Sequence, residues 1–376
     1  MPSAPVFVAS DIFRRSRHAT GHPLAIPRVA LTVDLCRALG WLPAGAYQEA
    51  PPASPAQLAR FHHPDYIASV IAAERTQSVG ERERDLYNLG VNGNAVYGEV
   101  FTRPATACGA SILAARQIAT GGIAYNPAGG THHGLPARAS GYCIFNDPVL
   151  AILELRTLGM DRVFYLDLDA HWGDGVQAAF AEDEHVFTLS IHEAGRWPME
   201  RGDGDDARPG GLGDRAGGAA RNLPLPPPAC DDEFIFLMET VVLPLIADFN
   251  ADAIVVQAGC DALSDDPMAR LALSNRALWA AVRMVMPLSP RLLVLGGGGY
   301  NPWAVARCWA GIWATLNGFP VPDRLPPRAE ALLRSVRWQH RLGRMPPDAW
   351  FTTLADRPRC GPIRDEVWRI AAEARH

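Results

Sequence analysis

The stretch VFYLDLDAHWGDG, residues 163–175, joins an apolar run directly to two carboxylates and an imidazole. Its first part, Val163–Leu166, does not alternate with polar residues, which is typical of a strand buried on both faces of a parallel sheet. In extended chain, alternate residues share a face, so Asp167, Asp169 and His171 would point the same way. Aiming two carboxylates inward is costly unless a positive charge faces them. The stretch therefore predicts a metal site at the end of a buried strand.

A helix cap or an ion-pair network is the alternative explanation of such a cluster. For an Asp-x-Asp motif alone we would favour that alternative. The added His171 and the Gly173-Asp174-Gly175 turn favour the metal.

Similar apolar runs and helical patterns alternate from about residue 120 to 317. The expected strands are Ile123–Tyr125, Val186–Ile191, Ala253–Gln257 and Arg291–Leu295. The expected helices are Pro148–Leu158 with Asp147 as N-cap, Asp231–Phe249 with a kink at Pro244, Ser274–Met286 and Trp303–Leu316. This alternation predicts an α/β fold with a parallel sheet, whose ligands bind at the carboxyl ends of the strands.

The remaining segments are less regular. The first hundred residues are rich in helix and loop, and residues 192–221 are expected to form a long irregular loop. Two further helices are expected, at Arg328–Gln339 and Ile363–Ala372. We expect a single domain over residues 1–376, with its core at about 5–318 and a helical extension at 319–376 packed on it.

Composition narrows the class of protein. The chain has 376 residues, of which 48% are hydrophobic, and a net charge of -5, which excludes a globally basic nucleic-acid binder. No segment approaches the roughly 20 apolar residues needed to span a bilayer, and no stretch resembles a secretory leader. The seven cysteines are scattered without a C-x-x-C pair, which favours reduced thiols over disulfides or a thiolate metal site. We expect a cytoplasmic protein with neither nucleic-acid nor membrane partners.

A third metal ligand is expected from another strand end. The run Val255–Cys260 leads through a small turn to Asp261, although Asp265 and Asp266 follow so closely that spacing alone leaves the ligand open. Three protein ligands plus water is the pattern of a catalytic metal. An oxygen-rich set of this kind leaves Zn²⁺, Fe²⁺ and Mn²⁺ open.

Two further motifs supply groups for acid–base chemistry. His132 and His133 follow a glycine pair, and Asp167 and Asp174 are free to orient one imidazole each if other carboxylates bind the metal. Tyr300 follows four glycines at 296–299 and has a hydroxyl that can hydrogen-bond a developing oxyanion. In isolation, the histidine pair is a weak signal that also fits core residues or metal ligands, and packing at a helix start would be the default for Tyr300.

In combination, these segments resemble the arginase/histone deacetylase superfamily, and within it the class I-like deacetylases and the bacterial acetoin-utilisation proteins. The resemblance runs from roughly Ala105 to Gly318. It is carried by the pair His132-His133, the element Gly141-Tyr142-Cys143, the motif Asp167–Gly175, the element Gly259–Met268 and the motif Gly296–Tyr300. Trp172 stands where the family has a second histidine that is not a ligand.

The resemblance implies one arginase/deacetylase domain, with about eight parallel strands flanked by helices. It implies Zn²⁺ held by Asp169, His171 and Asp261, with Fe²⁺ as an alternative. His133, supported by Asp174, would be the general base and then the general acid. His132, supported by Asp167, would be its electrostatic partner or a second proton donor, and Tyr300 would be the oxyanion clamp. Arginases bind two Mn²⁺, and the second acid that they need two residues after Asp261 is missing here.

The resemblance also implies sites for substrate and for monovalent ions. Gly141, Tyr142 and Met268 would line an acyl-lysine tunnel, and Asn92 stands near the position of a rim aspartate that grips the substrate backbone. A structural K⁺ would lie at Asp167, Asp169, His171, Ser190 and Ile191, and a second monovalent ion at Phe180, Asp183 and Val186.

The function implied is metal-dependent removal of acetyl or another short acyl group from a lysine-like amine. One alternative is an acetylpolyamine or other small-amide hydrolase, with an acidic rim supplied by Asp203, Asp205, Asp206 and Asp214. Another is a protein that binds acyl-amines without turnover. The sequence leaves the physiological substrate, acyl length, loaded metal and oligomeric state open.

Overall fold

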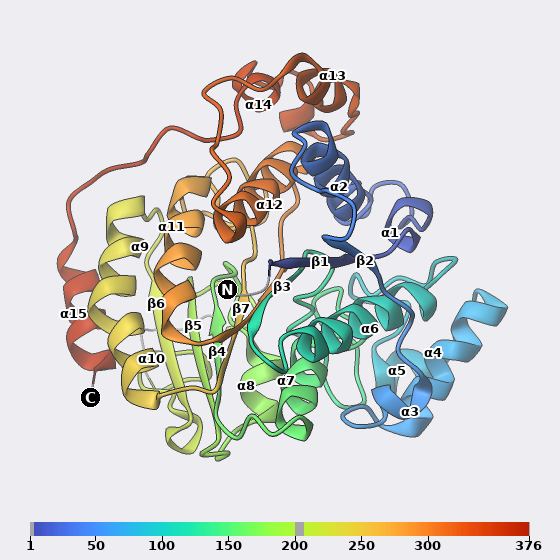
Figure 1. The fold of residues 1–376 in the computed structure, drawn as a ribbon. Helices are drawn as coiled ribbons and strands as arrows, with labels where there is room; N and C mark the ends of the chain where they lie inside the picture. Colours follow the sequence, from blue (N-terminus) through green and yellow to red (C-terminus); the bar gives the residue numbers. More distant parts are fainter. Residues whose placement is uncertain (1–3, 200–206, 376) are drawn as a thin grey trace.

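The computed structural model describes residues 4–199 and 207–375. Eight strands form one sheet in the order β2-β1-β3-β8-β7-β4-β5-β6, and all neighbours in it run parallel (Figure 1). The strands are β1 (Val6–Ala9), β2 (Tyr47–Glu49), β3 (Gly122–Asn126), β4 (Val163–Asp167), β5 (Val186–Glu193), β6 (Ala220–Leu225), β7 (Ala253–Gln257) and β8 (Arg291–Leu295). The predicted α/β class and parallel sheet are confirmed.

Helices cover both faces of the sheet (Figure 1). The longer ones are α2 (Arg28–Ala38), α4 (Pro64–Thr76), α6 (Thr102–Gln117), α7 (Asp147–Thr157), α11 (Asn275–Val285), α12 (Pro302–Asn317), α13 (Pro327–Ser335) and α15 (Asp365–Ala374). The shorter ones are α1 (Ile12–Arg15), α3 (Pro55–Leu58), α5 (Glu81–Tyr87), α8 (Asp174–Ala179), α9 (Asp231–Leu237), α10 (Leu243–Phe249) and α14 (Ala349–Thr352). Short 3₁₀ or π turns lie at η1 (Ala216–Gly218), η2 (Met238–Val242), η3 (Met286–Leu288) and η4 (Arg341–Gly343).

Strand β4 illustrates why its sequence lacks polar alternation. Phe164 and Leu166 pack on the face covered by α2, α9, α11 and α12. Val163 and Tyr165 pack on the opposite face, against α6 and α7. Both sides of the strand are therefore in the core, as expected for the centre of a parallel sheet.

Three strands were not predicted from their local sequences. β1 and β2 lie in the segment expected to be helix and loop, and β6 begins at Ala220, inside the expected loop 192–221. β2, with three residues, and β6 form the two edges of the sheet. β6 contains Pro224, and a proline is tolerated in an edge strand because no further strand needs its amide. Pairing with a neighbour, rather than a hydrophobic run, defines β2 and β6, whereas β1 is an apolar run of only four residues.

Helix boundaries also required correction. Asn146, not Asp147, caps α7: its side-chain oxygen accepts a hydrogen bond from the Val149 amide at 3.1 Å. The expected helix Asp231–Phe249 is divided into α9, the π-helical η2 and α10. The widened turn immediately precedes the first turn of α10, which holds Pro244, a residue that cannot donate the usual helical hydrogen bond.

The segment after residue 318 packs on the rest of the molecule. α14 and α13 lie beside α12 and α2, and α15 lies beside α9 and β6 (Figure 1). Trp350 stacks obliquely on Trp303, and Val367 and Ile370 are buried. Within residues 4–199 and 207–375, no helix combines the length and apolarity that a membrane span requires.

Candidate active site

The predicted site residues come from loops that follow four adjacent strands. In the sheet, β3, β8, β7 and β4 are consecutive neighbours, although far apart in sequence. The loop after β3 carries His132 and His133, that after β8 carries Tyr300, that after β7 carries Asp261, and that after β4 carries Asp169 and His171. The common direction of the strands places all four loops at one edge of the sheet.

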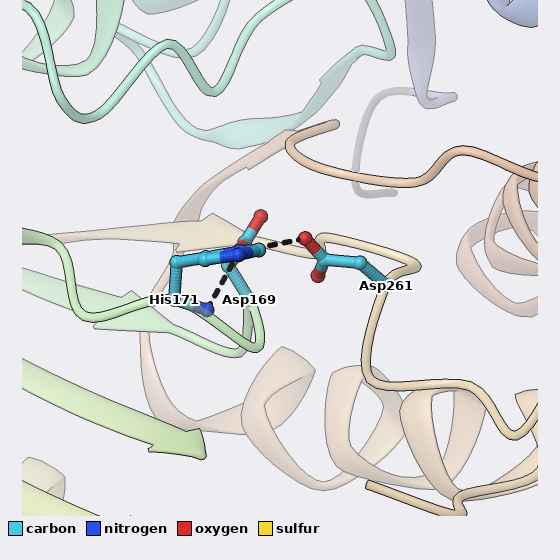
Figure 2. A group of neighbouring side chains, drawn as sticks. All are labelled: Asp169, His171 and Asp261. Atoms are coloured by element: carbon cyan, nitrogen blue, oxygen red, sulfur yellow. Dashed lines mark hydrogen bonds and ion pairs between the residues drawn. The ribbon is translucent and has the colours of Figure 1, made fainter. Parts of the chain in front are cut away.

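Asp169, His171 and Asp261 form a compact and buried group (Figure 2). One ligand atom from each lies within 4.8 Å of the others. His171 Nδ1 lies 2.9 Å from Asp261 Oδ2 and 3.1 Å from Asp169 Oδ1. Asp261, rather than Asp265 or Asp266, is thus the third member of the group.

The donor set fits a divalent metal. Two buried carboxylates place excess negative charge beside His171. Burial opposes protonation of this imidazole, but Asp261 and Asp169 outweigh burial and raise its pKa to about 10. No lysine or arginine of the described chain forms an ion pair with either carboxylate. Two carboxylate oxygens and one imidazole nitrogen beside excess negative charge match the ligand chemistry of a divalent ion such as Zn²⁺, Fe²⁺ or Mn²⁺.

The glycine run before Tyr300 has a steric cause. A Cβ on Gly298 would lie 2.0 Å from Asp261 Oδ2, and one on Gly296 would lie 2.3 Å from the Pro127 carbonyl oxygen. The Gly298 amide donates to Asp169 Oδ2 at 2.6 Å. The loop after β8 therefore holds the carboxylates by backbone contact, and a side chain there would displace them.

Each histidine of the pair contacts its own carboxylate. His132 Nδ1 lies 2.8 Å from Asp167 Oδ2, and His133 Nδ1 lies 2.6 Å from Asp174 Oδ1. The two ring centroids are 3.8 Å apart. Asp167 is itself fixed by the Tyr165 hydroxyl, which donates to its Oδ2 at 2.8 Å. With both Nδ1 atoms occupied, the Nε2 atoms are left for chemistry.

The surroundings give the two imidazoles opposite proton affinities. Burial and the neighbouring charge of His132 lower the pKa of His133 to about 4, although Asp174 opposes the shift. Burial disfavours charge on His132 as well, but Asp167 and Asp169 outweigh it and raise its pKa to about 9. A neutral imidazole beside a protonated one is the arrangement of a base with an electrostatic partner.

Tyr300 remains a hydrogen-bond donor. Burial, reinforced by the charge of Asp261, raises its pKa well above the ordinary value. Its amide donates to Asp266 Oδ2 at 2.6 Å, and the following Asn301 caps α12 while donating to the Asp265 carbonyl oxygen at 3.0 Å. The acids near Asp261 therefore position the tyrosine.

Two cavities meet at these groups. The inner one, of about 50 Å³, is lined by both histidines of the pair, Asp169, His171 and Tyr300, among others. The outer one, of about 560 Å³, is lined by Asn92, Gly141, Tyr142, Met268 and Trp197, among others. His133, Gly141, Tyr142, His171 and Tyr300 line both. The four residues predicted to bind substrate thus lie together at the outer cavity.

Trp197 is a wall residue that sequence reasoning missed. Its ring lies 4.8 Å from that of His133, centroid to centroid, and a Cβ on Gly141 would lie 2.7 Å from it. Trp197 is half exposed. It lies in the segment expected to be an irregular loop, where neither periodicity nor spacing singles out one residue.

The predicted monovalent-ion positions are partly brought together. Ser190 pairs in register with Asp167 across β4 and β5, and Ile191 follows it. The Ser190 hydroxyl lies 2.8 Å from His192 Nδ1. At the second position, the Asp183 amide donates to the Phe180 carbonyl oxygen and the Val186 amide to that of Asp183, each at 3.1 Å. The Asp183 carboxylate lies in an ion pair with Arg156, whose Nη1 donates to Oδ2 at 3.0 Å.

Asp147, a buried acid that was expected to be a helix cap, instead organises the loop that carries His132 and His133. Asp147 accepts hydrogen bonds from the amides of Gly130 and Thr131 at 3.1 and 2.8 Å and from the Ser111 hydroxyl at 2.5 Å. Arg28 similarly holds the glycine loop by donating to the Gly297 carbonyl oxygen at 2.7 Å. Arg28 lies 269 residues away from its partner in sequence, so no local pattern predicts this contact.

Comparison with known proteins supports these expectations. A family profile described as the histone deacetylase domain matches residues 22–316. The chain belongs to the histone deacetylase family. The match covers every loop of the site, from His132 to Tyr300. This histone deacetylase relative is accordingly an amide hydrolase of the deacetylase class, and the family resemblance seen in the sequence is confirmed.

Individual relatives agree with the family assignment. The chain is 32% identical to the acetoin utilization protein AcuC of Bacillus subtilis over 353 residues, covering 92% of this chain and 89% of that protein. It is 35% identical to histone deacetylase 3 of Oryza sativa over 315 residues, covering 82% of this chain but 60% of the rice protein. The crystal structure of a histone deacetylase homologue from Aquifex aeolicus superposes with a TM-score of 0.92 at 34% identity, covering both chains fully.

Proposed function

We propose that the protein hydrolyses the amide bond of an acetyl or other short acyl group on a lysine-like amine. Asp169, His171 and Asp261 would hold a divalent metal, Zn²⁺ in the first instance and Fe²⁺ as the alternative. When bound, such an ion acts as a Lewis acid toward the carbonyl and the attacking water. One observation carries the proposal: two carboxylate-supported imidazoles, two members of the metal group and a tyrosine line the same inner cavity.

The protein groups divide the proton transfers between them. His133 Nε2, on the imidazole with the lowered pKa, takes the proton of the attacking water and afterwards delivers it to the leaving amine. His132, held by Asp167, stabilises negative charge as it develops. The Tyr300 hydroxyl donates a hydrogen bond to the carbonyl oxygen as that oxygen becomes an oxyanion.

The outer cavity supports a chain-like substrate. Tyr142 and Trp197 provide aromatic walls for a methylene chain. The missing side chain of Gly141 lets the rings of His133 and Trp197 pack against its backbone at this wall. The inner cavity of about 50 Å³ suits an acetyl or similarly short acyl group. These dimensions support acyl-lysine as the substrate.

We further propose that the protein binds two monovalent ions and is located in the cytoplasm. A K⁺ would bind at Asp167, Asp169, His171, Ser190 and Ile191, through backbone oxygens in part, and a second monovalent ion at Phe180, Asp183 and Val186. All seven cysteines are free thiols, five of them buried, which supports a reducing, cytoplasmic compartment.

The test is turnover of a substrate panel by enzyme loaded with a defined metal. The panel holds acetyl-lysine peptides, longer acyl-lysine peptides and acetylpolyamines. We expect peptide turnover in the wild type and a loss of about 10²–10³ in rate for Tyr300→Phe, the usual cost of one oxyanion donor. His133→Ala should abolish turnover while the metal remains bound.

Other results would replace the proposal. Turnover of acetylpolyamines alone would make the protein a small-amide hydrolase. Retention of acyl-amine ligands without product, with metal bound, would make it a binding protein. Wild-type rates in Tyr300→Phe would contradict the role of the clamp.

A further inference from the structure

The outer cavity has an unusual charge distribution for a site expected to accept a basic side chain. Its polar lining includes three asparagines, Asn88, Asn92 and Asn94, and two arginines, Arg138 and Arg196. None of the described residues that line it is an aspartate or glutamate. The mouth formed by these residues therefore has a surplus of positive charge.

Arg138 is the uncompensated cation of the mouth. Its side chain is exposed, and its Nη1 donates only to backbone oxygens, of Asp85 at 2.9 Å and Leu86 at 3.3 Å. No carboxylate of the described chain lies within ion-pair distance of it. The next residue, Ala139, is tied down on both sides: its amide donates to the Tyr87 carbonyl oxygen and its own carbonyl oxygen accepts from Asn88 Nδ2, each at 2.9 Å. The guanidinium is thus presented from a fixed backbone.

Arg196 is held at the mouth by a buried acid. Its Nη2 lies 2.7 Å from Glu193 Oε1, and the other carboxylate oxygen accepts from the Arg270 amide at 2.5 Å. Glu193 is 3% exposed and is not part of the mouth lining, whereas Arg196 is. The ion pair is neutral overall, but the Arg196 guanidinium, and not the Glu193 carboxylate, is the partner that lines the mouth.

Of the four aspartates that could have formed an acidic rim, the structure describes only Asp214, which lies away from the mouth. Asp214 Oδ2 accepts from Gln177 Nε2 and from the Gly210 amide, both at 2.8 Å, and the residue does not line the mouth. Asp203, Asp205 and Asp206 lie outside the described residues. The described lining thus offers a polycation no carboxylate.

We propose that the mouth selects acyl-lysine substrates that carry a carboxylate next to the acylated side chain, with Arg138 as the principal contact and Arg196 as the second. This inference rests on the proposed function. A guanidinium offers paired donors that match a carboxylate, and charges at the rim of a site affect specificity and association rate most. An acidic flank gains from both arginines, whereas a basic flank or a polyamine is repelled.

The experiment compares three peptides that differ only in the residues flanking acetyl-lysine: aspartate, asparagine or lysine. We measure kcat/KM for turnover with wild type, and peptide binding by fluorescence anisotropy with the Tyr300→Phe variant. We expect the aspartate peptide to exceed the lysine peptide about threefold to tenfold at low salt in both measurements, and less at high salt. Arg138→Glu should reverse the order.

The matched control is Arg328→Glu, which changes the net charge equally at an exposed position on α13, outside the mouth lining. It should keep the wild-type order. Equal turnover of all three peptides would overturn the inference and leave the proposed function intact. Absence of any turnover would overturn the proposed function, and the binding order would then decide the inference alone. A preference for the lysine peptide, or the same order in Arg138→Glu as in wild type, would overturn it.

Discussion

At the scale of single residues, the site depends on side chains that their hydrogen bonds hold in a single orientation. His62 is an example outside the catalytic groups. Its Nδ1 lies 3.1 Å from the Leu135 carbonyl oxygen, and its Nε2 accepts from the Asn146 amide at 2.9 Å. These contacts require the neutral ring, and they connect the segment between α3 and α4 to Leu135, two residues after His133, and to Asn146, the N-cap of α7.

His62 predicts a specific pH dependence of stability. Burial, only partly offset by hydrogen bonds to backbone oxygens, lowers its pKa from 6.5 to about 4. The folded state therefore favours neutral His62, so the stabilisation is complete above pH 6.5 and is lost as pH falls toward 4. By pH 5 the loss should reach about 2 kcal/mol relative to pH 8. Urea unfolding of wild type and His62→Gln at the two pH values measures it.

In His62→Gln the pH-dependent loss should be smaller than in wild type by about that amount, because glutamine can hydrogen-bond but does not titrate. The same pH dependence in both proteins would show that His62 is not held neutral.

At the scale of elements, the loop after β8 is the part least tolerant of change. Gly298→Ala would place a methyl group 2.0 Å from Asp261 Oδ2 and 2.8 Å from Asp169 Oδ2. We expect zinc affinity, measured by competition with a chelating dye, to fall about tenfold to a hundredfold, as is usual when groups that orient ligands are disturbed.

Gly98→Ala is the matched control, since its Cβ meets nothing within 4 Å and its φ lies outside the left-handed region. It should bind zinc as the wild type does. Unchanged affinity in Gly298→Ala would mean that the loop can move away from the carboxylates at little cost.

The elements also show what sequence can and cannot predict. β4 and β7 are recognisable because burial on both faces demands continuous apolar residues. β1, β2 and β6 are short or lie at the edges, so their sequences carry little signal. Spacing in the sequence could not separate Asp261 from Asp265 and Asp266, because the three acids differ in where their side chains point. Asp266 accepts a hydrogen bond from the Tyr300 amide, and Asp265 accepts one from the Trp350 indole.

At the scale of the whole molecule, the site joins segments that only the sheet order brings together. Asp169 and His171 follow β4, and Asp261 follows β7, its neighbour. A metal bound by these three residues would link the two loops and bind the folded state alone. Ligand binding of this kind stabilises a protein by about 4 kcal/mol at a thousandfold excess over Kd. The contacts made by Arg28, Asp147 and Arg138 likewise depend on this long-range assembly, which is why sequence patterns did not reveal them.

The most direct test of the central claim is a titration of metal-free protein with Zn²⁺, in which Tm and acetate release from an acetyl-lysine peptide are followed together. We predict that acetate release rises in proportion to zinc and reaches its plateau at one ion per chain, and that Tm rises over the same additions and further as free zinc accumulates. In Asp261→Asn, neither should rise at the zinc concentrations that saturate the wild type. Full acetate release from the metal-free protein, or zinc-dependent turnover unchanged in Asp261→Asn, would contradict the account.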